Sequence, residues 1–467
     1  MFNTTYEIDG FRSLRDFHVE LTPGLNVLVG PNGSGKTNFL DFLGFLDTAV
    51  FSGATNAVSN SGGVAKVFSQ ENTTRNLARL EARISGIADL REVPMRTDSD
   101  LSRPLFYYSY DFELRFSRAQ SAVFFSKESL RIYKLFSEDD DRVASQIVGS
   151  IQAVRRAGGE DPPADWQFGS RLLVEHDRNP LSKVDAAYSK QKIVDRIPRL
   201  RTGNDHSILT RASRYDFPAL EAVRVAIVRG RSFNIAPNKA REAEDISRVP
   251  GIGRDGSGLA ATLFALQGLR KASQPRRLAR LPKAEPRSLD EMLEWSRLVL
   301  PELEDIQVQQ DPHTGKFSAL LLMASAQTLK IPLASASDGT LKWLSLVALI
   351  LTSGGVYSLE EPENFLHPRM QQNLVQLIRE SFADASRGSY FVFSTHSETL
   401  INCCRPEELV IFEFMEGATV CSRIDDPSAV LNEINRTGFG LGYYFANNAL
   451  PQGARVRRGH NGEDVPK

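Results

Sequence analysis

The stretch GPNGSGKT, residues 30–37, decides the fold of this chain. It matches the pattern G-x-x-x-x-G-K-[S/T] and lies between an apolar run, Leu25 to Val29, and an expected helix, Thr37 to Leu46. A glycine-rich turn at this place presents successive backbone N–H groups to phosphate oxygens, and the positive end of the helix dipole adds to the attraction. We therefore predict a nucleoside triphosphate site at this loop.

The loop residues have distinct expected roles in that site. Lys36 is expected to reach the terminal phosphates of ATP, and Thr37 to ligate Mg²⁺. The residues expected to line the nucleotide are Gly30, Pro31, Asn32, Gly33, Ser34, Gly35, Lys36, Thr37 and Asn38. ATP and Mg²⁺ are thus the predicted cofactors.

A second motif, VYSLEEPENFLHP from Val356 to Pro368, is a short apolar strand that ends in two carboxylates. We expect Glu360 to complete the Mg²⁺ shell and Glu361 to polarise the attacking water as general base. A carboxylate pair can also be a plain solvated strand end. The phosphate loop upstream favours the functional interpretation.

The third motif is YFVFSTHS, from Tyr390 to Ser397, a buried strand that ends in Thr395, His396 and Ser397. Because the carboxyl ends of parallel strands meet at one edge of a sheet, we expect His396 to lie beside the other motifs and to sense the γ-phosphate. A histidine after a strand is also often structural, since neutral imidazole suits many packing roles.

The fourth motif is ASASDGTLKWL, from Ala334 to Leu344. Ser337, Asp338 and Gly339 precede an expected helix and offer a hydroxyl, backbone donors and a dipole end to the nucleotide. A simple helix N-cap is the alternative for the same three residues.

The order of the expected elements predicts an α/β fold, with parallel core strands after Gly339 and half-buried antiparallel strands near residues 80–84 and 106–116. The sequence has no long heptad run, so we expect no coiled-coil arms.

The expected organisation has four parts. Residues 1–125 form the N-terminal half of an ATPase head, with the phosphate loop and an antiparallel β lobe, and residues 126–300 form a mainly helical insert. Residues 301–450 form the C-terminal half of the head, and residues 451–467 form a polar tail.

Composition excludes several classes of protein. The 467 residues are 41% hydrophobic and 24% charged, with a net charge of −1, which is typical of a globular protein with a large core. No window is apolar enough for a membrane span or a secretory signal, so we expect a cytoplasmic location without membrane partners. The three cysteines, Cys403, Cys404 and Cys421, do not have the spacing of a zinc site.

Positive charge is concentrated in residues 183–283, which hold 21 Lys and Arg against 9 Asp and Glu. A basic segment of this kind, which includes Arg270, Lys271 and Arg276, is suited to following a nucleic-acid backbone. A solvated helical face balanced by acidic neighbours is an equal alternative.

With these four motifs in this order, the chain resembles the ABC-type ATPase heads of the RecF and OLD group, including the AbiEii-like ATPases of bacterial defence. GFRSLRDFHVELTPGLNVLVGPNGSGKTNFLDFL near the start, and LASASDGTLKWLSL, SLEEPENFLHP and FSTHSETL near the end, carry the resemblance, and DGSGLAATL from Asp255 matches more loosely. Glu360 stands where many relatives have Asp, and the signature is S-D-G instead of L-S-G-G-Q. Gln70 is the candidate for the family's glutamine loop.

The resemblance implies that Ser337, Asp338 and Gly339 of one subunit close over the ATP held by Lys36 of another. Such heads form a homodimer, or a higher homo-oligomer, around sandwiched ATP, and hydrolysis reopens it.

The resemblance leaves two functions open. The first is a bacterial anti-phage defence ATPase that controls a separate effector subunit, a nuclease or toxin, because nothing after His396 resembles the Toprim nuclease fused to some OLD proteins. The alternative is a RecF-like repair ATPase that binds DNA and has no toxic effector. A transporter motor is disfavoured by the long segment between Lys36 and Glu360 and by the S-D-G signature.

Overall fold

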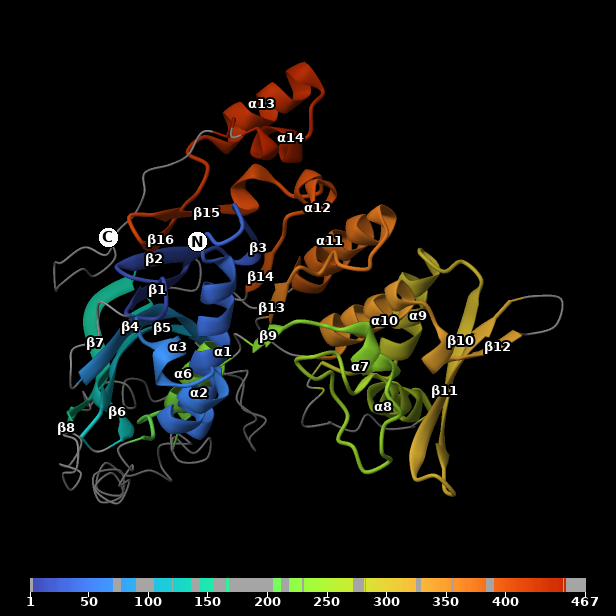
Figure 1. The fold of residues 1–467 in the computed structure, drawn as a ribbon, viewed down its shortest axis with the longest axis horizontal. Coiled ribbons are helices and arrows are strands. Elements are labelled where there is room, and N and C mark those ends of the chain that lie inside the picture. The colour runs from blue at the N-terminus through green and yellow to red at the C-terminus, as the bar shows by residue number, and fades with distance from the viewer. Residues whose placement is uncertain are drawn as a thin grey trace, which may run out of the picture.

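The fold consists of two large β-sheets with a helical layer between them and a second lobe beside them (Figure 1). The computed structural model describes residues 3–69, 77–89, 105–119, 121–135, 143–154, 165–167, 205–210, 218–228, 231–271, 281, 283–324, 329–353, 357–383, 390–447 and 449–450. In Figure 1 the larger sheet lies on the left, the second lobe lies on the right, and helices α13 and α14 project at the top.

The larger sheet is antiparallel, with the order β2-β1-β4-β5-β6-β7-β8. Its strands are β1 (Thr4–Asp9), β2 (Phe17–Leu21), β4 (Leu77–Asp89), β5 (Leu105–Ser117), β6 (Ala122–Leu135), β7 (Val143–Val154) and β8 (Asp165–Gln167). Strand β5 shows why these residues form a half-buried sheet. Tyr108, Tyr110 and Phe112 alternate along one face and join the core, whereas Asp111 on the other face pairs with Arg83 of β4.

The central sheet has the order β16-β15-β3-β14-β13-β9, and all of its strand pairs are parallel except β15 with β16. Its strands are β3 (Gly24–Val29), β9 (Arg231–Phe233), β13 (Tyr357–Glu360), β14 (Tyr390–Ser394), β15 (Leu409–Met415) and β16 (Ala418–Ser422). Alternate residues of β14 enter different cores: Tyr390 and Val392 face the helices shared with the larger sheet, and Phe391 and Phe393 face the second lobe. Both faces of the sheet are therefore covered, as parallel strands require.

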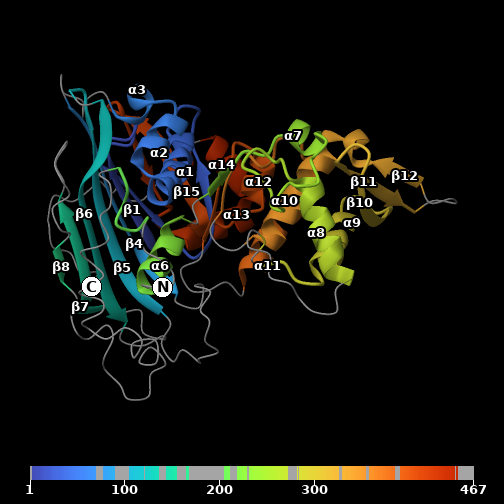
Figure 2. The same cartoon turned by 90° about the horizontal axis from the view of Figure 1, so that it is seen from below.

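Helix α1 (Lys36–Ser52) forms the layer between the two sheets. Its Phe39 packs edge to face on Tyr6 of β1, with ring centroids 5.6 Å apart, and lies 6.1 Å from Phe412 of β15. Three further helices lie in the same lobe, as Figure 2 shows from below: α2 (Ala54–Asn60), α3 (Val64–Val67) and α6 (Pro218–Val228). The phosphate loop at the start of α1 is thus attached to both sheets.

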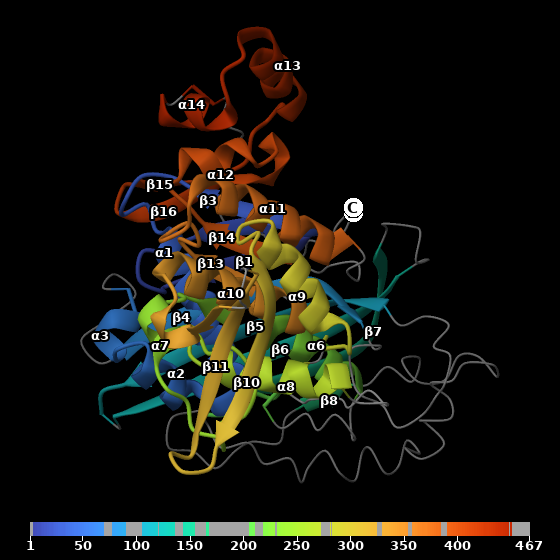
Figure 3. The same ribbon diagram turned by 90° about the vertical axis from the view of Figure 1, so that its right-hand side faces the viewer.

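The other face of the central sheet is covered by helices of the second lobe and of the C-terminal part of the chain (Figure 3). The helices of these two parts are α7 (Pro237–Arg241), α8 (Leu259–Lys271), α9 (Ser288–Arg297), α10 (Asp338–Thr352), α11 (Pro368–Ala383), α12 (Glu398–Asn402), α13 (Pro427–Thr437) and α14 (Leu441–Ala446), of which α13 and α14 project away from the sheet (Figure 1). A small antiparallel sheet, β10-β11-β12, completes the second lobe with strands β10 (Leu303–Asp311), β11 (Lys316–Met323) and β12 (Leu329–Pro332).

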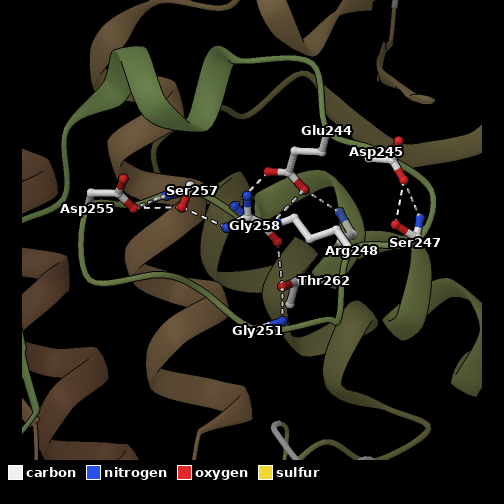
Figure 4. Close-up of polar contacts among 10 residues, drawn as sticks. Glu244, Asp245, Ser247, Arg248, Gly251, Asp255, Ser257, Gly258 and Thr262 are labelled. Carbon is white, nitrogen blue, oxygen red and sulfur yellow. Dashed lines mark hydrogen bonds and ion pairs between the residues drawn. The ribbon is translucent and has the colours of Figure 1, made fainter. Parts of the chain in front are cut away.

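Polar contacts hold together the loop between α7 and α8 (Figure 4), which also accepts backbone hydrogen bonds from Asn234 and Ala236, just after β9. The buried carboxylate of Glu244 accepts hydrogen bonds from the backbone N–H groups of Gly258, at 2.6 Å, and Ala261, at 3.0 Å. Thr262 Oγ1 accepts from the N–H of Gly251 at 2.9 Å. Glu244 therefore caps α8 from outside the helix and fixes the loop against it.

The predicted fold class, a mixed sheet core with an antiparallel β lobe, is confirmed. The boundary at residue 125 is wrong because β6 crosses it and pairs with β5 along most of its length. The described part of 126–300 is also not mainly helical: β7 and β8 continue the antiparallel sheet, and β9 joins the central sheet. The polar tail at 451–467 lies outside the described residues.

Helix lengths bear on two exclusions. The longest helix in the described ranges is α1, with 17 residues, so these ranges hold no coiled-coil arm. None of the described helices combines the length and the apolar composition that crossing a bilayer demands.

Trp343 of α10 tests the core between the central sheet and the second lobe. Its side chain is fully buried, and its indole Nε1 has no hydrogen-bond partner among the described residues. We expect Trp343→Ala to lower the free energy of unfolding by about 3–5 kcal/mol. Trp343→Phe should cost clearly less, because it keeps most of the apolar volume and removes an unpaired donor. Urea unfolding of both variants measures this, and equal losses would contradict the assignment of Trp343 to the core.

Candidate functional site

The phosphate loop, residues 30–37, requires glycine at two positions because other backbone and side-chain atoms approach it closely. Gly30 has a φ of 152°, and a Cβ there would lie 2.1 Å from the carbonyl oxygen of Phe412. Gly35, with a φ of 101°, would place a Cβ 2.0 Å from Oγ1 of Thr419. The strands β15 and β16 therefore support the loop from behind, and neither glycine can carry a side chain without displacing them.

Lys36 is held inside this loop. Its ammonium donates to the carbonyl oxygens of Gly30, at 2.8 Å, and Pro31, at 2.9 Å, and the residue is 5% exposed. Burial lowers the pKa of Lys36 to about 8, although the negative charge of Glu361 acts in the opposite direction. The Lys36 ammonium is thus held by two carbonyl oxygens of its own loop, which phosphate oxygens would replace in the expected ATP site.

Thr37 and Glu360 meet at the edge of the central sheet. The Thr37 hydroxyl donates to Oε1 of Glu360 at 2.6 Å, and the side-chain amide of Asn234, directly after β9, donates to Oε2 at 3.3 Å. Hydroxyl and carboxylate oxygens are the hard ligands that Mg²⁺ takes together with phosphate oxygens. The donor set therefore fits the predicted magnesium site.

Glu361 adopts an unusual backbone conformation at the end of β13. Its φ is +43°, its N–H donates to the carbonyl oxygen of Ser394 at 3.1 Å, and its carboxylate accepts from the side chain of Asn364 at 2.9 Å. A left-handed conformation in a glutamate is strained and persists where the surroundings impose it. This conformation turns the chain away from the direction of β13 at Glu361, so the adjacent carboxylates of Glu360 and Glu361 point in different directions.

Glu363, which lies in the second motif shortly after Glu361, is hydrogen-bonded to the third motif, Tyr390 to Ser397. Its Oε1 accepts from the Thr395 hydroxyl at 2.6 Å and from the N–H of His396 at 3.0 Å. Its Oε2 is buried and has no partner among the described residues. The nearby ammonium of Lys342, on α10, donates to the Ile235 carbonyl oxygen at 2.8 Å. Burial lowers the pKa of Lys342 to about 8, and the negative charges of Glu363 and Glu361 only partly oppose this change.

The imidazole of His396 is exposed at the end of β14. Partial burial and the positive charge of Lys36 lower its pKa below the ordinary value, and Glu361 and Glu363 only partly oppose this. A lowered pKa keeps the ring neutral near pH 7, so that it can donate one hydrogen bond and accept another.

Ser337 and Asp338 lie at the start of α10 and are both exposed. Ser337 is the helix N-cap, and its Oγ accepts from the N–H of Thr340 at 3.2 Å. Asp338 accepts from Nη2 of Arg241 at 2.7 Å. The cap interpretation is therefore correct for Ser337 in this structure, and it leaves the nucleotide role open.

Gly339 connects α10 to the loop that follows Glu361. A Cβ at Gly339 would lie 2.8 Å from the carbonyl oxygen of Phe365. This close approach explains why glycine stands at the third signature position, since any side chain would push the loop away from the helix.

The side chain of Asn38, a residue predicted to line the nucleotide, is hydrogen-bonded to the loop that follows β1. Its side-chain amide donates to Ser13 Oγ at 2.6 Å and accepts from Arg12 at 3.2 Å. Ser13 in turn shares a 2.7 Å hydrogen bond with Thr419. Arg12 also pairs with Asp41 of α1. This loop therefore forms one wall beside the phosphate loop.

The structure brings most of the predicted site residues to one sheet edge. Lys36, Thr37, Glu360, Glu361 and His396 are linked there by a hydrogen bond or by mutual electrostatic effects. Pro31, Asn32 and Gly33 form the exposed tip of the phosphate loop, whereas Ser34 and Gly35 are buried. Ser337, Asp338 and Gly339 contact other residues, and Gln70 lies outside the described residues.

Solved structures of SMC heads resemble the chain at low sequence identity. An SMC head bound to the C-terminal winged-helix domain of ScpA has a TM-score of 0.44 at 13% identity, with 91% of this chain and 99% of that chain covered. The SMC head domain from Thermotoga maritima has a TM-score of 0.37 at 11% identity, with the same coverage. The fold assignment accordingly rests on the topology described above.

Curated relatives match a short part of the chain. The DNA replication and repair protein RecF of Beutenbergia cavernae is 42% identical over 48 residues, which are 10% of this chain and 12% of that protein. RecF of Pediococcus pentosaceus is 38% identical over 76 residues, 14% of this chain and 20% of that protein. The chain thus spans about an eighth to a fifth of the length of these relatives.

Family models match both halves of the head. Residues 7–150 match an AAA domain, and residues 256–402 match the family described as "AAA domain, putative AbiEii toxin, Type IV TA system". The first match includes the phosphate loop, and the second includes the carboxylate, signature and histidine motifs. Both matched segments are thus similar to AAA-type ATPase domains. The matched ranges also cross both predicted boundaries, at residues 125 and 300.

Sequence reasoning missed four polar residues of this ATPase site. Asn234 follows a strand of only three residues, which has no readable periodicity, and Lys342 lies within an apolar helix where a charge could have been noticed. Arg12 stands in the quoted GFRSL opening, and Glu363 in the quoted carboxylate motif, but neither was given a role. Their functions depend on contacts between distant segments, which spacing does not reveal.

The basic segment 183–283 lies partly outside the described residues. Within the described part, Arg270 donates to Asp305, at 3.1 Å, and to Asp290, at 3.3 Å. These ion pairs agree with a solvated helical face at this position and occupy the guanidinium.

The lowered pKa of Lys36 makes a prediction about pH. Phosphate binding needs the ammonium form, so ATP affinity should fall as pH rises above about 8, by up to about tenfold per pH unit. Lys36→Arg should show a flatter profile at lower affinity, because guanidinium stays protonated. Titration with a fluorescent ATP analogue between pH 7.5 and 9.5 measures both. A wild-type affinity that is constant over this range would contradict the assignment.

Proposed function

We propose that two copies of this ATPase assemble head to head around two ATP molecules, and that hydrolysis separates them. The observation that supports this most is the division of the site. Ser337 and Asp338 are exposed at the start of α10, whereas Lys36, Thr37 and Glu360 are gathered at the edge of the central sheet. Exposed signature residues are available to the nucleotide of a second copy.

In this proposal the residues at the sheet edge divide the work of binding. Lys36 and the backbone N–H groups of the loop bind the phosphates, and Thr37 and Glu360 hold Mg²⁺. When bound, Mg²⁺ neutralises charge on the phosphate oxygens. Asn234 orients Glu360 through the hydrogen bond to Oε2.

Glu361 is the proposed general base for the attacking water. Its carboxylate is fixed by Asn364 and by the left-handed backbone, and it lies within electrostatic range of Lys36 and His396. Neutral His396 is suited to contact the γ-phosphate or the water through its ring N–H. Glu363 positions His396 by accepting from its backbone N–H.

The base assignment is tested with Glu361→Gln. This change keeps the shape and removes the proton acceptor, so ATP binding should persist, hydrolysis should fall by about 100-fold or more, and an ATP-bound dimer should accumulate. Phosphate release and light scattering after size exclusion measure these effects. Lys36→Ala is the matched control, which should lose ATP binding itself. Normal turnover in Glu361→Gln would remove Glu361 from this role.

At the level of biology, we propose that the ATPase controls a separate effector subunit, a nuclease or toxin, in anti-phage defence. The match of residues 256–402 to the AbiEii-like family supports this. The RecF matches support the alternative, a DNA-binding repair ATPase, over a much shorter stretch. The two proposals share the head and differ in the partner.

The partner is tested by capture on the ATP-bound dimer. Tagged Glu361→Gln protein is purified with ATP from its native cells, treated with nuclease, and analysed by mass spectrometry, with Lys36→Ala as the matched control. A stoichiometric nuclease or toxin-like subunit that is absent from the control is the expected result. Replication or repair factors in its place would favour the RecF-like alternative.

A further inference from the structure

The signature segment carries a charge that opposes its proposed ligand. Asp338 is the first residue of α10, and its side chain is 47% exposed. The proposed function brings this helix start to the terminal phosphate of an ATP molecule held by a second copy. A carboxylate close to a polyanion is repelled, most strongly in an interface from which water is excluded. The sequence S-D-G therefore needs a compensating positive charge.

Arg241 provides a positive charge at that place. One nitrogen of its guanidinium, Nη2, donates to Asp338 Oδ1 at 2.7 Å and to the carbonyl oxygen of Ala336 at 2.9 Å. The side chain thus bridges the carboxylate and the backbone immediately before the helix. Because Ala336 precedes the cap residue Ser337, the guanidinium holds both sides of the helix start.

The position of Arg241 is fixed by its own helix. It is the last residue of α7, in which Pro237 and Ala240 are buried, and α7 packs against α10. The neighbouring Lys239 is engaged elsewhere, at 2.7 Å from Glu242. Lys342, one turn into α10, is buried and donates to the Ile235 carbonyl oxygen. Of these three described cations near the helix start, Arg241 is therefore the one that contacts Asp338.

We infer that Arg241 is a positioning residue that neutralises Asp338, so that the start of α10 accepts the terminal phosphate of ATP bound to a second copy. This inference rests on the proposed ATP-bound dimer. Asp338 favours the start of the helix, as acidic residues in the first turn do, and Arg241 removes the cost of its charge to the interface. An ordinary exposed ion pair would contribute little, and its loss would leave nucleotide-dependent association unchanged.

The test compares dimerisation in the Glu361→Gln background, where ATP is retained. Arg241→Ala should weaken ATP-dependent dimerisation by about tenfold or more, because Asp338 is left unpaired against the phosphate. Adding Asp338→Asn to Arg241→Ala should restore dimerisation to within about threefold of the parent, since the opposing charge is gone. Analytical ultracentrifugation with and without ATP measures the dissociation constants. Lys239→Ala, two residues away on the same helix, is the matched control.

Three outcomes would overturn the inference. If Arg241→Ala dimerises as tightly as the parent, the ion pair is only structural. If the double variant stays as weak as Arg241→Ala while its melting temperature equals that of the parent, Arg241 acts on something other than the charge of Asp338. If the parent itself stays monomeric with ATP, the proposed dimer fails, and the inference fails with it. The first two outcomes leave the proposed dimer standing.

Discussion

The pairing of β3 with β14 and β15 is the constraint on which the site depends. Strand β3 comes from the N-terminal part of the chain, and its Val27 lies opposite Phe393 of β14 and Leu409 of β15. Because these strands are parallel, their carboxyl ends meet at one edge, where the phosphate loop leaves β3 and His396 follows β14. The hydrogen bond from Thr37 to Glu360 joins residues 323 positions apart in the sequence. A shift in this register would separate the residues proposed to bind phosphate from those proposed to act on it.

The elements that the sequence predicts well are those whose signal is local. The phosphate loop directly follows a short apolar strand, and so do the carboxylates at Glu360 and Glu361. The boundary at residue 125 failed for the opposite reason. It falls inside β6, whose pairing with β5 is a long-range property and whose sequence includes Glu128, a buried polar residue that interrupts the apolar alternation.

The site residues that the sequence did not predict are placed by long-range contacts. Asn234 reaches Glu360 because a distant loop holds its backbone in place. The N–H of Asn234 donates to the carbonyl oxygen of Arg254 at 2.8 Å. The side chain of Arg254 in turn donates to Asp47 of α1 at 2.6 Å. Glu244 in turn fixes that loop to α8. Each link joins segments far apart in the sequence, so the contact that places Asn234 exists only in the folded chain.

Three charged side chains of the candidate site have hydrogen-bond partners within the chain. Lys36 uses the carbonyl oxygens of its own loop, Glu360 uses Thr37 and Asn234, and Asp338 uses Arg241. In the proposed function, binding of ATP with Mg²⁺ exchanges these hydrogen bonds for others, so the net gain is smaller than the sum of the new contacts. The same exchange makes the site sensitive to the state of the nucleotide, because the partners of Lys36 and Glu360 differ between the two conditions. Under this proposal, Lys36 and Glu360 can thus return to their partners within the chain once the phosphates leave.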